Sequence, residues 1–304
     1  SDSKSTLFAS ICAFIAIFAC GRNGYRAITT ESSMGLGCSG IGMECPSCKR
    51  GFLRFSIPRR DVTSAMHSRL VQIQDDIRGD FGWRLQDDLD SAKDLLWYCE
   101  SKSWSNPSWS PSGRQDTLLM LQEGLISGPL TVLGAAAEPS NVRDAIVEGH
   151  RLIAADGAVG VLNESEYPGI AWDALLCVVS DGDGDMEDLA KAAEQGVPFV
   201  LHAHGDNVKQ WIELLDILLL YDTPIVLTHQ TPGLLKGMHN PGGFTDGDRA
   251  VCFALSQNVS QRRIRLRGFR TDSIGRWTGQ TNPERKMRKL EWMSRVLNIA
   301  GVSM

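Results

Sequence analysis

Short apolar runs alternate with helix-forming stretches from Pro129 to the end of the chain, and this alternation constrains the fold more than any other feature. We expect strands within PLTVLGAAA, RLIAADGA, LLCVVSD, VPFVLHAHGD, PIVLTHQ and RIRLRGF. We expect helices between them at Asn141–Glu148, Ala158–Asn163, Met186–Gly196, Asn207–Leu220, Asp246–Gln257 and Glu284–Asn298. This order predicts right-handed crossovers and an α/β fold with a doubly wound, mostly parallel sheet.

The region before the first strand is predicted to be helical. Apolar residues recur at helical spacing between Met66 and Glu100, with a break at Gly82. A loop rich in Ser, Pro and Trp is expected at Ser101–Asp116, and we expect its tryptophans to pack the loop against the protein. The predicted organisation is therefore a helical N-terminal region at 66–127 and an α/β catalytic domain at 128–304.

Residues 1–65 differ from the rest in charge and cysteine content. They hold eight Lys or Arg against four acids, and five of the eight cysteines. The apolar run Leu7–Cys20 is shorter than the roughly 20 residues of a membrane helix. Cys45 and Cys48 have the spacing of half a zinc knuckle, without a clear second pair. We expect this segment to be disordered or a non-native upstream extension.

Net charge and the cysteines of the remaining chain limit the classes of partner and the compartment that we expect. The formal net charge of −5 gives no support to a nucleic-acid surface. No membrane partner is expected for residues 66–304. Cys177 and Cys252 lie in apolar runs, as is typical of reduced core cysteines, which predicts a cytoplasmic protein. The sequence leaves open whether the protein forms a homo-oligomer.

Acids and glycines follow the predicted strands, at the point where each strand ends. Asp181 and Asp183 belong to DGDGD, and Asp156 stands beside Gly157 after an earlier strand. Loops at the carboxyl ends of parallel strands line one crevice, so these acids are expected to be neighbours. Mg²⁺ takes oxygen ligands and commonly bridges carboxylates to substrate phosphates. The pattern predicts a metal-dependent phosphate-transfer site with Asp181 and Asp183 as ligands.

The motif HAHGDN ends another predicted strand. His202 and His204 share one face of the strand tip, and Asp206 follows two residues later. An H-x-H pair also suits zinc or a barrel hydrolase, but the roughly six expected strands are too few for an eight-unit barrel. We expect a histidine of this motif to contact phosphate or act as a general base, and Asp206 to be a further metal ligand.

The motif GGFTDGDRA places two glycines before a predicted helix start. Exposed N–H groups and the helix dipole favour anions there. Arg249 would add a forked phosphate contact. Asp246 and Asp248 are interpreted either as metal ligands or as capping groups.

Taken in order, ADGA, DGDGD, HAHGDN and GGFTDGDRA resemble the archaeal 6-hydroxymethyl-7,8-dihydropterin diphosphokinases, whose catalytic domain is similar in fold to thiamin pyrophosphokinase. The resemblance covers about Met66 to Gly301. It implies transfer of diphosphate from ATP to the hydroxymethyl group of 6-hydroxymethyl-7,8-dihydropterin, with release of AMP, on the route to folate-type or methanopterin-type carriers. Gly182 departs from the family pattern, which usually has Leu or Phe between the two acids.

The resemblance also implies residue roles. The expected catalytic residues are Asp181, Asp183, His202, His204 and Asp206. The expected ligands of Mg²⁺ are Asp181, Asp183 and Asp206. The residues expected to bind ATP or the pterin are Asp156, Gly157, Asn207, Gly242, Gly243, Thr245, Asp246, Asp248 and Arg249.

Two alternatives stay open at this point. Motility accessory factors that glycosylate flagellin resemble the same domain and use a sugar nucleotide, but GAAAEPSN at Gly134–Asn141 is a poor version of their glycine-rich loop. A non-catalytic nucleotide-binding or metal-binding module is the other alternative, and the number of acids retained together speaks against it.

Overall fold

The computed structural model of the protein describes residues 64–304. The segment for which we predicted disorder or a non-native origin, residues 1–65, therefore lies almost entirely outside the described residues. No helix among residues 64–304 combines the length and the apolar character that a membrane span requires.

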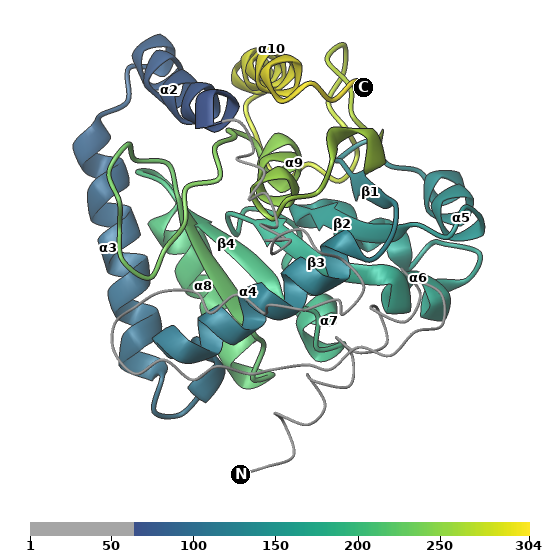
Figure 1. Cartoon of the computed structure of the whole chain (residues 1–304), viewed down its shortest axis with the longest axis horizontal. Helices are drawn as coiled ribbons and strands as arrows, with labels where there is room; N and C mark the ends of the chain where they lie inside the picture. Colours follow the sequence, from purple (N-terminus) through teal and green to yellow (C-terminus); the bar gives the residue numbers. More distant parts are fainter. Residues whose placement is uncertain (1–63) are drawn as a thin grey trace, which may run out of the picture. The chain divides into compact units, whose positions relative to one another are not determined.

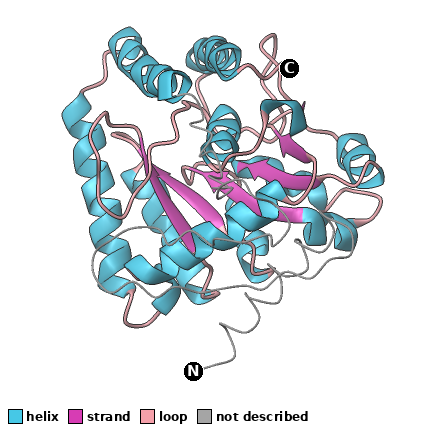
Figure 2. Ribbon diagram, viewed as in Figure 1, coloured by secondary structure: helices cyan, strands magenta, loops and turns pink. Residues whose placement is uncertain are grey.

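Within residues 64–304, six strands form one sheet in which every pairing is parallel (Figure 2). The strand order is β5-β4-β3-β2-β1-β6. The strands are β1 Leu130–Leu133, β2 Arg151–Ala155, β3 Leu175–Ser180, β4 Phe199–Ala203, β5 Ile225–His229 and β6 Ile264–Arg267. Each of them falls inside a predicted strand, which confirms the α/β fold with a parallel sheet.

Helices lie before, between and after the strands (Figure 1). The α-helices are α2 Ser64–Phe81, α3 Leu85–Lys102, α4 Pro111–Ile126, α5 Pro139–Val147, α6 Pro168–Ala174, α7 Met186–Glu194, α8 Val208–Leu220, α9 Asp246–Ser256 and α10 Pro283–Ala300. Three 3₁₀ helices are η1 Pro107–Trp109, η2 Asp156–Leu162 and η3 Gln261–Arg263.

The structure differs from the expected elements at three places. The stretch after β2 is the 3₁₀ helix η2 rather than an α-helix, α6 was not predicted, and α4 begins inside the predicted loop. Pro111 at the first turn of α4 and the Ser110 side chain, which accepts from the Gly113 N–H, explain the early start. Of the two loop tryptophans, Trp109 is buried and donates to the Thr223 carbonyl, whereas Trp104 is 84% exposed.

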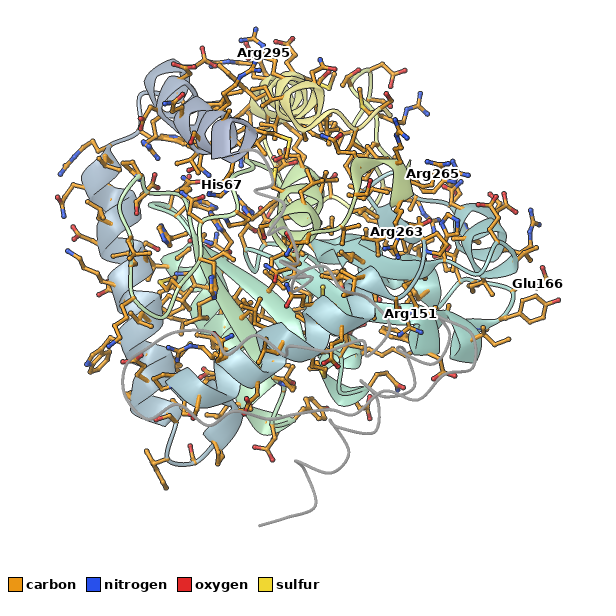
Figure 3. All side chains as sticks on the ribbon, in the orientation of Figure 1. His67, Arg151, Glu166, Arg263, Arg265 and Arg295 are labelled. Atoms are coloured by element: carbon orange, nitrogen blue, oxygen red, sulfur yellow. The ribbon has the colours of Figure 1, made fainter. Side chains whose placement is uncertain are left out.

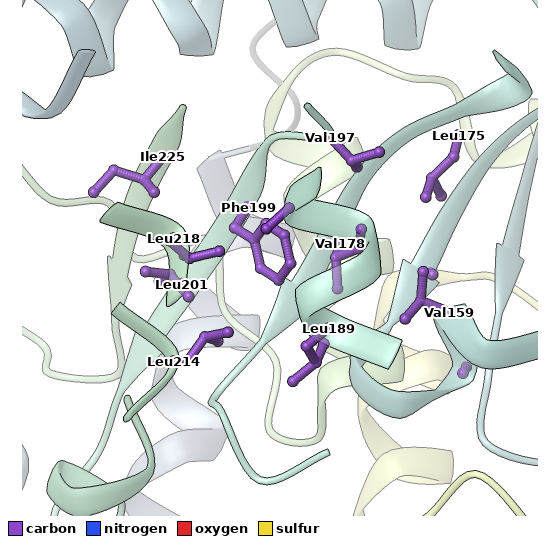
Figure 4. Packing of buried hydrophobic residues seen from close by; sticks show 14 of the residues in the cluster. Val159, Leu175, Val178, Leu189, Val197, Phe199, Leu201, Leu214, Leu218 and Ile225 are labelled. Carbon is purple, nitrogen blue, oxygen red and sulfur yellow. The ribbon is translucent and has the colours of Figure 1, made fainter. Parts of the chain in front are cut away.

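Alternate residues of the strands point to opposite faces of the sheet and build two apolar clusters. On one face, Val178, Phe199 and Leu201 pack against Leu189 of α7 and Leu214 of α8 (Figure 4). The other face is covered by residues of α2, α4, α9 and α10. Burial on both faces explains why the strands read as continuous apolar runs.

A buried ion pair connects helices α2 and α3 to the loops at the carboxyl ends of β4 and β5. Arg78 of α2 donates to the Asp88 carboxylate of α3 over 3.0 Å and to the Gln230 carbonyl over 2.7 Å. Asp88 also accepts from the Gly205 backbone N–H and from the Gln230 side chain. The loops that follow β4 and β5 are thereby held against α3.

Candidate functional site

Four carboxylates converge at the carboxyl ends of β2 and β3 and at the start of α9. They belong to Asp156, Asp181, Asp183 and Asp246, and one oxygen from each lies within 4.8 Å of the others. Asp156 directly follows β2, Asp181 directly follows β3, and Asp246 opens α9. The parallel sheet therefore brings together acids that are far apart in the sequence, as expected from their positions at strand ends.

Glycines allow the loop after β3 to hold this arrangement. Gly182 has a φ of +88°, and a Cβ there would lie 2.9 Å from the backbone carbonyl of Gln210. A Cβ at Gly184 would lie 2.4 Å from Oδ2 of Asp156. A larger residue at Gly182 would be strained by its positive φ and would press on α8, which explains the glycine between the two acids.

Burial and crowding of negative charge together shift the pKa values of three of the four carboxylates toward their neutral form. Burial, followed by the nearby acids, raises the pKa of Asp156 well above its ordinary value. The Asp181 charge and then burial raise the pKa of Asp183. Burial and the Asp181 charge raise the pKa of Asp246 to about 7. This repulsion is what a shared cation would relieve.

Asp181 differs from the other three because a positive partner stabilises its charge. Burial alone would raise its pKa, but the His204 imidazole, 3.1 Å from Oδ2, and the charges of Arg249 and Lys289 lower it below its usual range. Its Oδ1 is buried and has no hydrogen-bond partner among the described residues. An ionised, unpartnered carboxylate oxygen inside an acidic cluster fits a hard divalent cation.

His204 bridges two carboxylates. Its Nδ1 lies 2.7 Å from Asp206 and its Nε2 faces Asp181. Burial acts against its charge, but the hydrogen bonds to both acids outweigh burial and raise the pKa of His204 to about 9. Asp206 also pairs with Arg285 over 2.8 Å and lies outside the four-carboxylate group. A protonated His204 has no free lone pair, so this geometry suits charge compensation rather than a general base.

His202 and Asn207 support the loop after β4. His202 is 1% exposed, with Nδ1 3.0 Å from the Thr228 hydroxyl, and burial holds its pKa well below the ordinary value. Asn207 donates to the backbone carbonyls of Asp181 and His202 and accepts from the His204 N–H. Both side chains are buried, so they position the neighbouring Asp181 and His204.

The polar residues of GGFTDGDRA have different roles at the start of α9. Asp248 is fully buried and accepts from the backbone N–H groups of Phe244 and Thr245, so it caps the helix. Arg249 is 1% exposed and donates to Asp246 and to the Phe244 carbonyl. The Arg249 guanidinium therefore orients Asp246 from the protein interior. Our expectation that it faces a bound phosphate was wrong.

The remaining predicted glycines contact protein atoms. Gly242 and Gly243 have φ values of +87° and +91°, and a Cβ at either would meet Leu70 or the Arg249 backbone within 2.7 Å. A Cβ at Gly157 would lie 2.6 Å from the Trp277 carbonyl. These glycines shape the turns that carry the acids, and none of them lines the two pockets described next.

Two pockets adjoin the carboxylates, and they share Asp183, Thr245, Asp246 and Lys286. The first, here called the switch-point pocket, is further lined by the turns after β1 and β6 and by the loop before α10; its other residues include Gly134, Ala135, Gly268, Phe269, Arg270 and Trp277. The second, here called the aromatic pocket, is further lined by Trp83, Asp181, His204, Gln230, Phe244 and Lys289.

Our sequence interpretation missed the cationic residues of α10. Lys286 and Lys289 are three residues apart, so they lie on one face of the helix and line the site. The basic run ERKMRK at the start of the closing helix was the available signal. It could not be assigned because a charged helix face more commonly faces solvent.

No protein-family model matches this chain. Three curated archaeal proteins are similar to it, and each is named 6-hydroxymethyl-7,8-dihydropterin pyrophosphokinase. The protein of Pyrococcus furiosus is 38% identical over 152 residues, which are 48% of this chain and 59% of that protein. The protein of Methanothermobacter thermautotrophicus is 35% identical over 165 residues, 51% of this chain and 64% of that protein.

The third relative, from Methanocaldococcus jannaschii, is 35% identical over 123 residues, 39% of this chain and 46% of that protein. The chain thus matches between about half and two thirds of the length of these curated relatives. Over about half of its own length, it is similar to archaeal pyrophosphokinases that are named for a pterin substrate.

Proposed function

We propose that this protein is a 6-hydroxymethyl-7,8-dihydropterin diphosphokinase that transfers diphosphate from ATP to the pterin hydroxymethyl group and releases AMP. The observation that carries the proposal is the group of four converging carboxylates with the unpartnered Oδ1 of Asp181, placed where two pockets meet. The names of the three similar archaeal proteins support the same reaction.

Asp181, Asp183, Asp156 and Asp246 would hold Mg²⁺. The donors are all carboxylate oxygens, which suits Mg²⁺ better than zinc, whose usual ligands are nitrogen and sulfur. When bound, the ion would supply positive charge against the triphosphate oxygens. In this assignment Asp156 and Asp246 join Asp181 and Asp183, whereas Asp206, the third ligand expected from the sequence, acts through His204 instead.

The protein groups contribute position and charge, as phosphoryl transfer requires. Protonated His204 keeps Asp181 ionised and correctly oriented. Arg249 does the same for Asp246 from the protein interior. The hydroxymethyl oxygen bonds to the β-phosphorus, the bond from that phosphorus to the α–β bridging oxygen breaks, AMP leaves with the bonding electrons, and the hydroxyl proton passes to solvent.

The test is incubation of the purified protein with ATP, Mg²⁺ and 6-hydroxymethyl-7,8-dihydropterin, followed by separation of the nucleotides. We expect AMP and pterin diphosphate in equal amounts, no AMP without the pterin, and loss of both products after chelation. Mg²⁺ should restore activity where Zn²⁺ does not. Formation of ADP, or turnover of a sugar nucleotide without AMP formation from ATP, would contradict the proposal.

A further inference from the structure

The two pockets meet at a small set of shared residues. Asp183, Thr245, Asp246 and Lys286 line both of them, so a group lying against these residues can be reached from either side. A transfer reaction between two substrates needs this arrangement, with the transferred group at the boundary and one substrate on each side.

The switch-point pocket lies where the sheet reverses its direction of growth. From β1 the chain proceeds outward through β2 to β5, and β6 then pairs with the opposite edge of β1. In open parallel sheets, ligands bind in the crevice that this reversal opens at the carboxyl ends of the strands. The turns after β1 and β6 contribute Gly134, Ala135 and Gly268 to its lining, and a Cβ at Gly134 or Gly268 would meet the backbone of the other turn, so the glycines let these two turns lie close together at the crevice.

The aromatic pocket has a different chemistry. The ring centroids of Trp83 and Phe244 lie 6.0 Å apart, and both rings line it. The Lys289 ammonium lies 6.0 Å from the Trp83 centroid and 5.9 Å from the Phe244 centroid. A lining of aromatic rings beside a cation suits a flat, polar heteroaromatic ring.

Lys286 stands at the boundary with an unpaired charge. Its neighbours on α10, Arg285 and Arg288, form ion pairs with Asp206 and Asp80. Among the described residues, Lys286 has no carboxylate within ion-pair distance, although its charge partly offsets the rise in the pKa of Asp183 and Asp246. It is half-buried and lines both pockets, so its charge is available to an anionic group between them.

We infer that the switch-point pocket binds ATP, that the aromatic pocket binds the pterin ring, and that Lys286 is a catalytic residue that contacts the diphosphate during its transfer. This inference rests on the proposed function. The Lys286 ammonium would lie beside the β-phosphate as its bond to AMP breaks, and Lys289 would contact the acceptor alone.

The experiment compares four substitutions of a cationic residue by methionine. None of the four residues is fully buried, so the fold should tolerate each change. The variants are Arg270→Met, Lys286→Met, Lys289→Met and Arg295→Met. Arg270 lines the switch-point pocket only, and Lys289 lines the aromatic pocket only. Arg295 is the matched control, because it lies on α10 away from both pockets and points outward (Figure 3). Steady-state AMP formation gives kcat and a KM for each substrate, and thermal melting checks that every variant is folded.

At saturating Mg²⁺, which offsets the loss of the Lys289 charge near Asp181, we expect Lys289→Met to raise the KM for the pterin about tenfold and to leave the KM for ATP unchanged. Arg270→Met should raise the KM for ATP about tenfold and leave the KM for the pterin unchanged. Lys286→Met should lower kcat about a hundredfold, because its contact strengthens as charge develops on the transferred group, and Lys286→Arg should restore part of that loss. Arg295→Met should match the wild type.

The outcomes separate this inference from the function on which it rests. If the wild type forms AMP but Lys289→Met changes the KM for ATP, or Arg270→Met changes that for the pterin, the assignment of the pockets is overturned and the function stands. An unchanged kcat in folded Lys286→Met would overturn the role of Lys286. If the wild type forms no AMP, the proposed function and this inference both fail.

Discussion

At the scale of single residues, the four carboxylates of the site are held in different states. Asp181 is kept ionised by its hydrogen bond with His204, whereas Asp156, Asp183 and Asp246 have raised pKa values. The protein therefore supplies one fixed negative charge and three carboxyl groups whose ionisation a cation would favour. A metal held in this way binds more weakly when any one charge is removed.

We expect Asp181→Asn or Asp183→Asn to lower the rate of AMP formation by at least about a hundredfold. The change is isosteric and follows the end of a strand, so we expect both variants to keep the fold, which circular dichroism checks. Turnover is measured over a range of Mg²⁺ concentrations. Asp185→Asn is the matched control, because Asp185 lies in the same loop but caps α7 through the N–H groups of Glu187 and Asp188, which an asparagine can also do.

Near-normal turnover of the Asp181 or Asp183 variant at saturating Mg²⁺ would argue against the metal assignment. A loss of the same size in Asp185→Asn would show that the loop, rather than the charge, is responsible.

At the scale of elements, the site depends on how helix α9 begins. Asp248 holds the Phe244 and Thr245 N–H groups, and the next residue, Arg249, holds Asp246. The helix start thus fixes both the direction of its first turn and the position of one carboxylate of the cluster.

Asp248→Ala should lower the free energy of unfolding by about 2–4 kcal/mol, because the buried Phe244 N–H and the partly buried Thr245 N–H lose their acceptor. Asp248→Asn should cost clearly less, since its amide oxygen can still accept one of these bonds. Urea denaturation of the two variants and the wild type measures the difference. Equal stability of all three proteins would contradict the capping role of Asp248.

At the scale of the whole molecule, burial keeps a histidine at the end of β5 neutral. His229 is 1% exposed, and its Nδ1 accepts from the Thr231 backbone N–H and lies 2.8 Å from the Thr231 hydroxyl. Burial, with a smaller effect from His239, lowers the pKa of His229 to about 4. In the unfolded chain its pKa is about 6.5, so the unfolded state takes up the proton first as the pH falls.

The free energy of unfolding should therefore fall as the pH drops from about 6.5 toward 4, with about 2 kcal/mol lost by pH 5 through His229. Urea denaturation at pH 7 and pH 5 measures the loss. Other groups titrate in the same range, so His229→Gln is the comparison, and its loss should be smaller by about that amount. The same pH dependence in both proteins would show that His229 is not the cause.

The sequence by itself was enough to predict the sheet and part of the site. Apolar runs bounded by turn residues identified every strand of the described sheet, because strands buried on both faces are mostly apolar, although the edge strand β6 alternates apolar residues with arginines. Asp156, Asp181 and Asp246 could be expected near one another, because each follows a strand or opens a helix at the same edge. These inferences depend only on local pattern and on the rule of parallel connection.

Only the tertiary structure decided which polar residues face the site. Arg249 and Asp248 stand in a motif that favours anions, yet packing of α9 turns both toward the protein interior. Lys286 and Lys289 face the carboxylates because α10 packs against α2 and α9 beside the sheet edge. The direction in which a side chain points depends on how its helix packs, and that packing is set by contacts between segments far apart in the sequence, which no local pattern records.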